Sequence, residues 1–198
     1  PKRMPRAKTN GIELEYDTLG SANDPAVLLV MGFALQMTRW PEGLKRGLAD
    51  AGFRVIWFDN RDVGLSTEIA NVTPLGALEI MQAAMTGKDT SKLVAYTLDD
   101  MAADTAGLLD AIGVDQATII GMSMGGMIGQ QLGARYPERV HSLSLCDTAS
   151  EMPPRSLWEE RFAIAHKEGI AGLVDGTIKR WFTASFIARA PQDIAKVR

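Results

Sequence analysis

The strongest constraint on this chain is a serine between two glycines, at a point where a strand gives way to a helix. Residues 121–125 read Gly-Met-Ser-Met-Gly and fit the pattern G-x-S-x-G. The apolar run 117–122 is typical of a buried strand, and the segment 124–136 has helical spacing before Pro137. A side chain at Gly121 or Gly125 would collide with neighbouring backbone in such a tight turn. The pattern predicts Ser123 as a nucleophile; a glycine-rich turn with an incidental serine is the alternative.

The rest of the chain up to residue 150 alternates between strand and helix patterns. Short apolar runs predict buried strands over residues 26–31, 53–58, 117–122 and 140–146, and alternation predicts an exposed-edge strand over 11–19. Helical spacing predicts helices over 41–51, 97–112 and 124–136, with a shorter one near 75–85. Short links between these elements favour right-handed crossovers. We expect an α/β fold: a mainly parallel sheet with helices on both faces.

Three segments of different character follow from the same patterns. Residues 1–9 hold four basic side chains and predict a solvated tail. Residues 10–150 predict the N-terminal part of an α/β core. After Pro153-Pro154, residues 151–198 show helical patterns only. They are interpreted as the start of a helical cap, with the C-terminal strands of the core absent.

Composition excludes several other functions. The net charge of −3 and pI of about 5.4 argue against a nucleic-acid partner. Cys146 is the single cysteine, which excludes an internal disulfide and favours a reducing, cytoplasmic location. No apolar stretch is long enough to cross a membrane. Two distant histidines offer no metal-ligand set, and no nucleotide-binding motif is present, so no metal and no cofactor are expected.

A serine nucleophile needs a base to take its proton and donors for the developing oxyanion. The backbone N–H of Met124, at the start of the helix, is one candidate donor. The second is expected from the loop after the strand 26–31, where the N–H of Phe33 follows Gly32. Phe33 and Met124 are therefore the predicted oxyanion-hole residues.

These residues, together with two further segments, resemble the α/β-hydrolase superfamily. The segments are Val27–Phe33, with Trp40 after it, and Phe58–Ser66, which correspond to the patterns H-G-F and D-x-R-G-x-G-x-S. Met31 and Asp62 stand where the family usually has His and Gly. Both variants resemble the branch that contains aclacinomycin methylesterase. The resemblance makes Asp59, at the end of its strand, a structural residue.

Residues from Ser123 onward are similar to another branch, 3-oxoadipate enol-lactonase. The similar segments are Ser123–Gln130, Leu145–Ala149, Leu157–Trp158 and Arg180–Thr183. Both resemblances imply hydrolysis of a small-molecule carboxylic ester or lactone through a seryl acyl-enzyme.

The family places an acid and then a histidine after the serine. His141 begins a strand, at the end of the sheet away from the predicted site, and His166 lies in a helical segment, so both are interpreted as structural or solvated. Asp147 follows the fourth buried strand and is a candidate acid, with a turn-capping residue as the alternative. The base is therefore expected from a further C-terminal portion or a second polypeptide that completes the fold.

Two other functions use the same residues. A cofactor-free perhydrolase or haloperoxidase would employ the same serine. A non-catalytic ligand-binding homologue would keep the fold without the base, and the two poorly placed histidines favour it.

Overall fold

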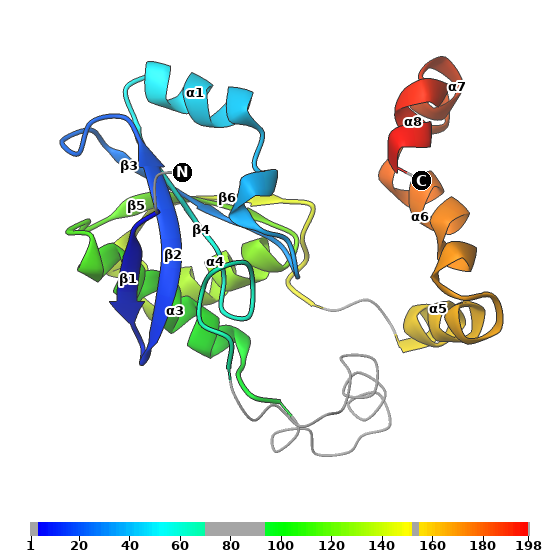
Figure 1. Cartoon of the computed structure of the whole chain (residues 1–198), viewed down its shortest axis with the longest axis horizontal. Coiled ribbons are helices and arrows are strands. Elements are labelled where there is room, and N and C mark those ends of the chain that lie inside the picture. The colour runs from blue at the N-terminus through cyan, green and yellow to red at the C-terminus, as the bar shows by residue number, and fades with distance from the viewer. Residues whose placement is uncertain (1–3, 70–93, 152–154, 198) are drawn as a thin grey trace. The chain divides into compact units, whose positions relative to one another are not determined.

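The computed structural model describes residues 4–69, 94–151 and 155–197. The chain forms two compact units, Pro1–Ser150 and Glu151–Arg198. The first unit contains one six-stranded sheet in the order β1-β2-β4-β3-β5-β6 (Figure 1). Its strands are β1 (Arg6–Thr9), β2 (Ile12–Leu19), β3 (Ala26–Val30), β4 (Arg54–Phe58), β5 (Ala117–Met122) and β6 (Val140–Cys146). Strands β4, β3, β5 and β6 run parallel to one another, and β2 pairs antiparallel with both β1 and β4. The predicted α/β fold with a mainly parallel sheet is confirmed.

Helices cover both faces of this sheet. The first unit contains η1 (Met37–Arg39), α1 (Glu42–Asp50), α3 (Leu98–Ala111), α4 (Met124–Arg135) and η2 (Pro137–Arg139). Helix α1 lies on one side of the strands, and α3 and α4 lie together on the other (Figure 1). Each of the three long helices begins and ends within two residues of its predicted bounds.

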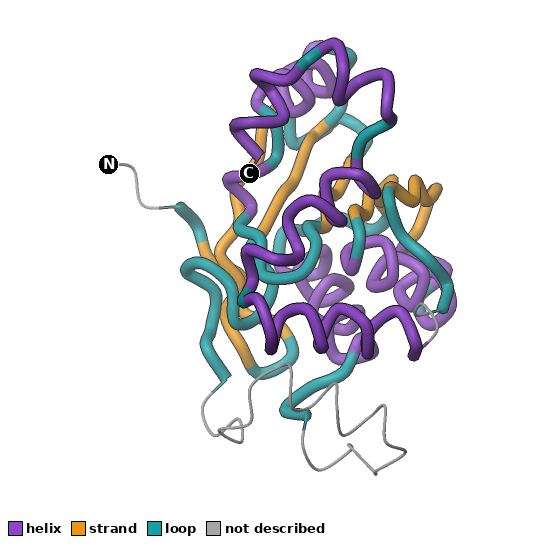
Figure 2. The backbone as a smooth tube through the Cα atoms, turned by 90° about the vertical axis from the view of Figure 1, so that its right-hand side faces the viewer, coloured by secondary structure: helices purple, strands orange, loops and turns teal. Residues whose placement is uncertain are grey.

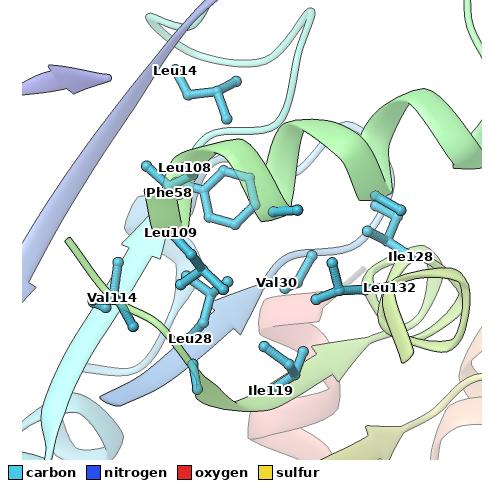
Figure 3. Close-up of a cluster of buried hydrophobic side chains, with 14 of the residues drawn as sticks. Leu14, Leu28, Val30, Phe58, Leu108, Leu109, Val114, Ile119, Ile128 and Leu132 are labelled. Carbon is cyan, nitrogen blue, oxygen red and sulfur yellow. The ribbon is translucent and has the colours of Figure 1, made fainter. Parts of the chain in front are cut away.

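The core has two layers because neighbouring residues of a strand point to opposite faces. Leu28 and Val30 of β3 meet Phe58 of β4 and the apolar side chains of α3 and α4 (Figure 3). Val27 and Leu29 point to the other layer, in which Val55 and Trp57 are also buried. The central strands are therefore covered on both faces, which explains their unbroken apolar sequences.

Two edges of the sheet differ from expectation. Residues 6–9, expected within a solvated tail, form the edge strand β1, because Ala7 and Thr9 turn inward and are buried while main-chain bonds join β1 to β2. Strand β2 consequently lies inside the sheet rather than at its edge.

Strand β6 is the last strand of the sheet on the other side, and the expectation of a fully buried strand is wrong there. None of its residues is buried, and Leu145 is 46% exposed. An edge strand has a neighbour on one side only, so its apolar sequence does not by itself bury it.

The described residues of the second unit form helices joined by short turns, with no strand among them, as expected. It contains α5 (Arg155–Glu168), η3 (Ile170–Leu173), α6 (Val174–Trp181), α7 (Ala184–Arg189) and α8 (Pro191–Val197), drawn in purple in Figure 2. The helix expected near residues 75–85 lies outside the described residues. Of the helices in the described ranges, none is both long and apolar enough to span a membrane.

Candidate active site

Ser123 occupies a strained turn between β5 and α4. Its φ of 54° lies in the left-handed region, which a residue with a Cβ adopts only when its surroundings hold it there. Its N–H donates to the carbonyl of Cys146 at 2.9 Å, and its own carbonyl accepts from the N–H of Gly126 at 2.9 Å. The side chain is exposed. The turn therefore presents the serine outward while its backbone is fixed on both sides.

The glycines on either side of Ser123 are required by close approach of the backbone. A Cβ on Gly121 would lie 2.4 Å from the carbonyl oxygen of Gly125. A Cβ on Gly125 would lie 2.1 Å from the carbonyl oxygen of Val30, the last residue of β3. Both distances are far inside van der Waals contact with backbone atoms, so any larger residue must displace a strand or the helix.

The loop after β3 lies against the serine. A Cβ on Gly32 would be 3.1 Å from the Cβ of Ser123 and 3.6 Å from its Oγ. Within the described part of the chain, neither the N–H of Phe33 nor that of Met124 donates a hydrogen bond to another protein group. Phe33 is 65% exposed. Two free amide donors therefore lie close to the serine in the chain or in space: Met124 follows Ser123 directly, and Phe33 follows Gly32, which lies against it.

Asp59 has a structural environment, in agreement with the resemblance. Its carboxylate, almost fully buried, accepts from the N–H of Met37 at 2.6 Å and from that of Leu65 at 3.3 Å. Burial raises the pKa of Asp59, and these hydrogen bonds partly oppose the shift. A Cβ on Gly64 would lie 1.9 Å from this carboxylate. Asp59 thus joins the loop after β3 to the loop after β4.

Asp62, which stands where the family usually has glycine, adopts a φ of 62°. Aspartate tolerates this left-handed conformation better than most residues. Its side chain also accepts from the N–H of Ile69 at 2.6 Å. The substitution therefore keeps the turn and adds a local hydrogen bond.

Within the first unit, His141 lies far from Ser123. His141 lies opposite the bulge at Ala117/Thr118, five residues before Cys146, whose neighbour in the ladder is Met122. At the usual rise of a strand this puts it about 16 Å from the serine end of the sheet. His166 is an exposed residue of α5, in the second unit.

Asp147 directly follows β6 at the serine end, as expected, with a φ of 46°. The side chain is exposed, and the prediction that a buried strand precedes it is wrong, as described above.

Thr148 was not predicted from the sequence. Its hydroxyl donates to the carbonyl of Ser123 at 2.6 Å, and its side chain fills the space in which a Cβ on Gly126 would stand, 2.6–2.8 Å away. Threonine after a strand is too common a pattern to mark such a contact. Cys146 and Thr148, two residues apart, thus hold the N–H and the carbonyl of the serine.

Replacing Thr148 with valine should lower the free energy of unfolding by about 1 kcal/mol, because the shape stays and one hydrogen bond is lost. If the hydroxyl also orients Ser123, labelling of the serine by a fluorophosphonate should slow by about tenfold. Thr148→Ser, which keeps the hydroxyl, should restore most of the labelling rate. A Thr148→Val protein that labels as fast as the parent would contradict the orienting role. Urea unfolding and timed labelling measure the two effects.

Comparisons with known proteins identify the family of the chain. The pattern that defines the α/β-hydrolase fold family matches residues 25–172, and the chain belongs to this family. The chain is 28% identical over 186 residues to 3-oxoadipate enol-lactonase 2 from Acinetobacter baylyi, covering 94% of the chain and 60% of that protein. It is 31% identical over 134 residues to a rhodomycin D methylesterase from Streptomyces sp. strain C5, covering 68% of the chain and 38% of that protein.

A solved structure gives the same result. The crystal structure of the enol-lactonase from Burkholderia xenovorans LB400 matches with a TM-score of 0.67 and 30% identity, over 98% of this chain and 65% of that one. The chain therefore spans less than two thirds of the length of these relatives. Hydrolases of esters and lactones are the class to which it is similar.

Proposed function

We propose that the protein containing this chain hydrolyses a small-molecule carboxylic ester or lactone through an acyl-enzyme on Ser123. The observation that carries the proposal is the exposed serine on a backbone turn with a φ of 54°, held between β5, β6 and the loop after β3. Relatives with lactonase and methylesterase names support the substrate class. A cytoplasmic location stays a prediction.

In this reaction the Ser123 oxygen attacks the carbonyl carbon of the substrate, and the carbonyl oxygen becomes an oxyanion. The free N–H groups of Phe33 and Met124 are proposed to donate to that oxygen. The alcohol then leaves, and water attacks the acyl-serine to release the acid and regenerate the hydroxyl. When the substrate is a lactone, the leaving alcohol remains joined to the acid product.

The base that takes the Ser123 proton is proposed to be a histidine outside these 198 residues. His141 lies at the other end of its strand, and the relatives are longer than the matched region. Asp147 remains a candidate for the acid that orients the base. Residues 151–198 are proposed to begin a helical cap that contributes to substrate specificity.

The test uses the full-length protein, a fluorophosphonate probe and hydrolysis of a p-nitrophenyl ester and a lactone. We expect covalent labelling at Ser123, found by peptide mass spectrometry, and loss of both labelling and hydrolysis in Ser123→Ala. His141→Ala and His166→Ala should keep both activities. Labelling that persists in Ser123→Ala would refute the proposal, and absence of labelling in the parent protein would favour the non-catalytic ligand-binding alternative.

A further inference from the structure

The second unit contains a pocket that is lined by residues of this unit. It has a volume of about 350 Å³ and lies between α5, η3 and α6. Apolar side chains line part of it: Leu157, Ile164 and Leu173. Gly176 of α6 also lines it, and a Cβ at this position would meet no atom within 4 Å. The pocket therefore has apolar walls and free space beside α6.

Two arginines line this pocket, one from α5 and one from α6. The guanidinium of Arg161 lies over the Trp158 ring, 4.8 Å from its centre, within the range of a cation–π contact. The guanidinium of Arg180 donates to the hydroxyl of Thr177, one turn earlier, at 3.2 Å. Both side chains are thus held in place by uncharged partners.

The positive charge of this pair is not neutralised by ion pairing. The ion pairs described within residues 155–197, Lys167 with Glu168 and Lys196 with Asp193, involve neither guanidinium. Burial lowers the pKa of Arg161, the charge of Arg180 lowers it further, and the charge of Glu160 partly opposes both. Among the described residues that line the pocket, Glu160 is the one with a carboxylate. Two guanidinium groups against one carboxylate leave an excess positive charge beside an apolar wall.

We propose that this pocket binds a small aliphatic carboxylate, whose oxygens accept hydrogen bonds from Arg161 and Arg180 while its hydrocarbon chain lies against Leu157, Ile164 and Leu173. Guanidinium groups donate two parallel N–H bonds that match a carboxylate. The apolar wall favours an organic acid over an inorganic anion, since phosphate has no hydrocarbon to bury. The inference goes beyond the proposed reaction, and it is tested by binding alone, so it stands or falls separately from Ser123.

The experiment titrates the full chain with hexanoate by isothermal titration calorimetry, with hexanamide and inorganic phosphate as comparison ligands. Hexanoate should bind, hexanamide should bind at least about tenfold more weakly because it lacks the charge, and phosphate should bind more weakly than hexanoate. Raising the salt concentration should weaken hexanoate binding.

Variants locate the site. Arg161→Gln and Arg180→Gln should each weaken hexanoate binding by about tenfold. Gly176→Leu should block binding while both arginines remain, since its side chain would occupy the free space. Arg189→Gln is the matched control: Arg189 also lies over an aromatic ring, that of Phe186 at 5.3 Å, but does not line the pocket.

Four results would overturn the proposal. The first two are no binding of hexanoate, and equal binding of hexanoate and hexanamide. The third is binding that Arg189→Gln weakens as much as Arg161→Gln does. The fourth is phosphate that binds more tightly than hexanoate, which would refute the assignment to an organic acid. Circular dichroism of each variant shows whether a loss of binding comes from loss of helix.

Discussion

Replacing Asp104 with alanine is expected to lower the free energy of unfolding by about 3–5 kcal/mol. Asp104 accepts two hydrogen bonds from Arg61, at 2.6 and 2.7 Å, and both residues are buried. Burial disfavours the charged form of Arg61, but the hydrogen bonds and charge of Asp104 leave its pKa above the ordinary value. Alanine would leave that guanidinium charged, buried and unpaired.

The carboxylate of Asp104 also accepts a hydrogen bond from the side-chain amide of Asn10 at 2.9 Å. The backbone carbonyl of Asp104 accepts one from the hydroxyl of Thr9 at 3.1 Å. These bonds attach the turn between β1 and β2 to α3. The alanine variant should therefore also loosen β1, whose amides should exchange with solvent faster than in the parent protein. Hydrogen exchange measured by mass spectrometry tests this second effect.

Asp110→Ala provides the matched control on the same helix. Asp110 pairs with Arg139, but its own side chain is 69% exposed, so its loss should cost at most about 1 kcal/mol. The double variant Arg61→Met with Asp104→Leu should regain most of the lost stability, because no charge is then left unpaired. If urea unfolding places Asp104→Ala within 1 kcal/mol of the parent, or no lower than Asp110→Ala, the buried pair does not have the assigned role.

Local patterns were sufficient to predict every strand except β1, and the strand-to-helix turn at the serine. The run 117–122 is recognisable because burial on two faces demands unbroken apolar sequence. The start of α3 is marked locally as well, because Thr97 and Asp100 form a capping box there. The glycines two residues before and after Ser123 are needed because backbone segments approach closely there, and a short sequence pattern is enough to indicate this.

Contacts between distant residues could not be predicted in this way. Arg61 and Asp104 are 43 positions apart, and neither has a neighbour in sequence that marks it as buried. Strand β1 is short and basic, and its strand structure depends on pairing with β2 rather than on propensity. Burial of β6 depends on what packs beside it, which its own apolar residues do not determine.

The serine turn combines both kinds of information. The pattern of glycines is local, whereas the groups that hold the strained backbone come from β6, which follows α4 in the chain. Cys146 accepts from the N–H of Ser123, and Thr148 donates to its carbonyl. A strained conformation persists when its surroundings determine it more than once, and here two hydrogen bonds from the end of β6 and the residues just after it do so.

Gly125 tests the contact between α4 and β3. Gly125→Ala is expected to lower the free energy of unfolding by about 3 kcal/mol, because its Cβ would stand 2.1 Å from the Val30 oxygen and 2.8 Å from the Met31 oxygen. Both are backbone atoms, so relief requires moving β3 and the loop that continues to Phe33. Fluorophosphonate labelling of Ser123 should therefore fall together with stability.

Gly133→Ala on the same helix separates this contact from helix propensity. A Cβ at Gly133 would meet no atom within 4 Å, so alanine there should raise the free energy of unfolding by about 0.5–1 kcal/mol. The same chemical change should thus have opposite signs at two positions of α4, as measured by urea unfolding. If Gly125→Ala were also stabilising, β3 and α4 would not be in the close contact that presents the serine, and the proposed orientation of its hydroxyl would lose its support.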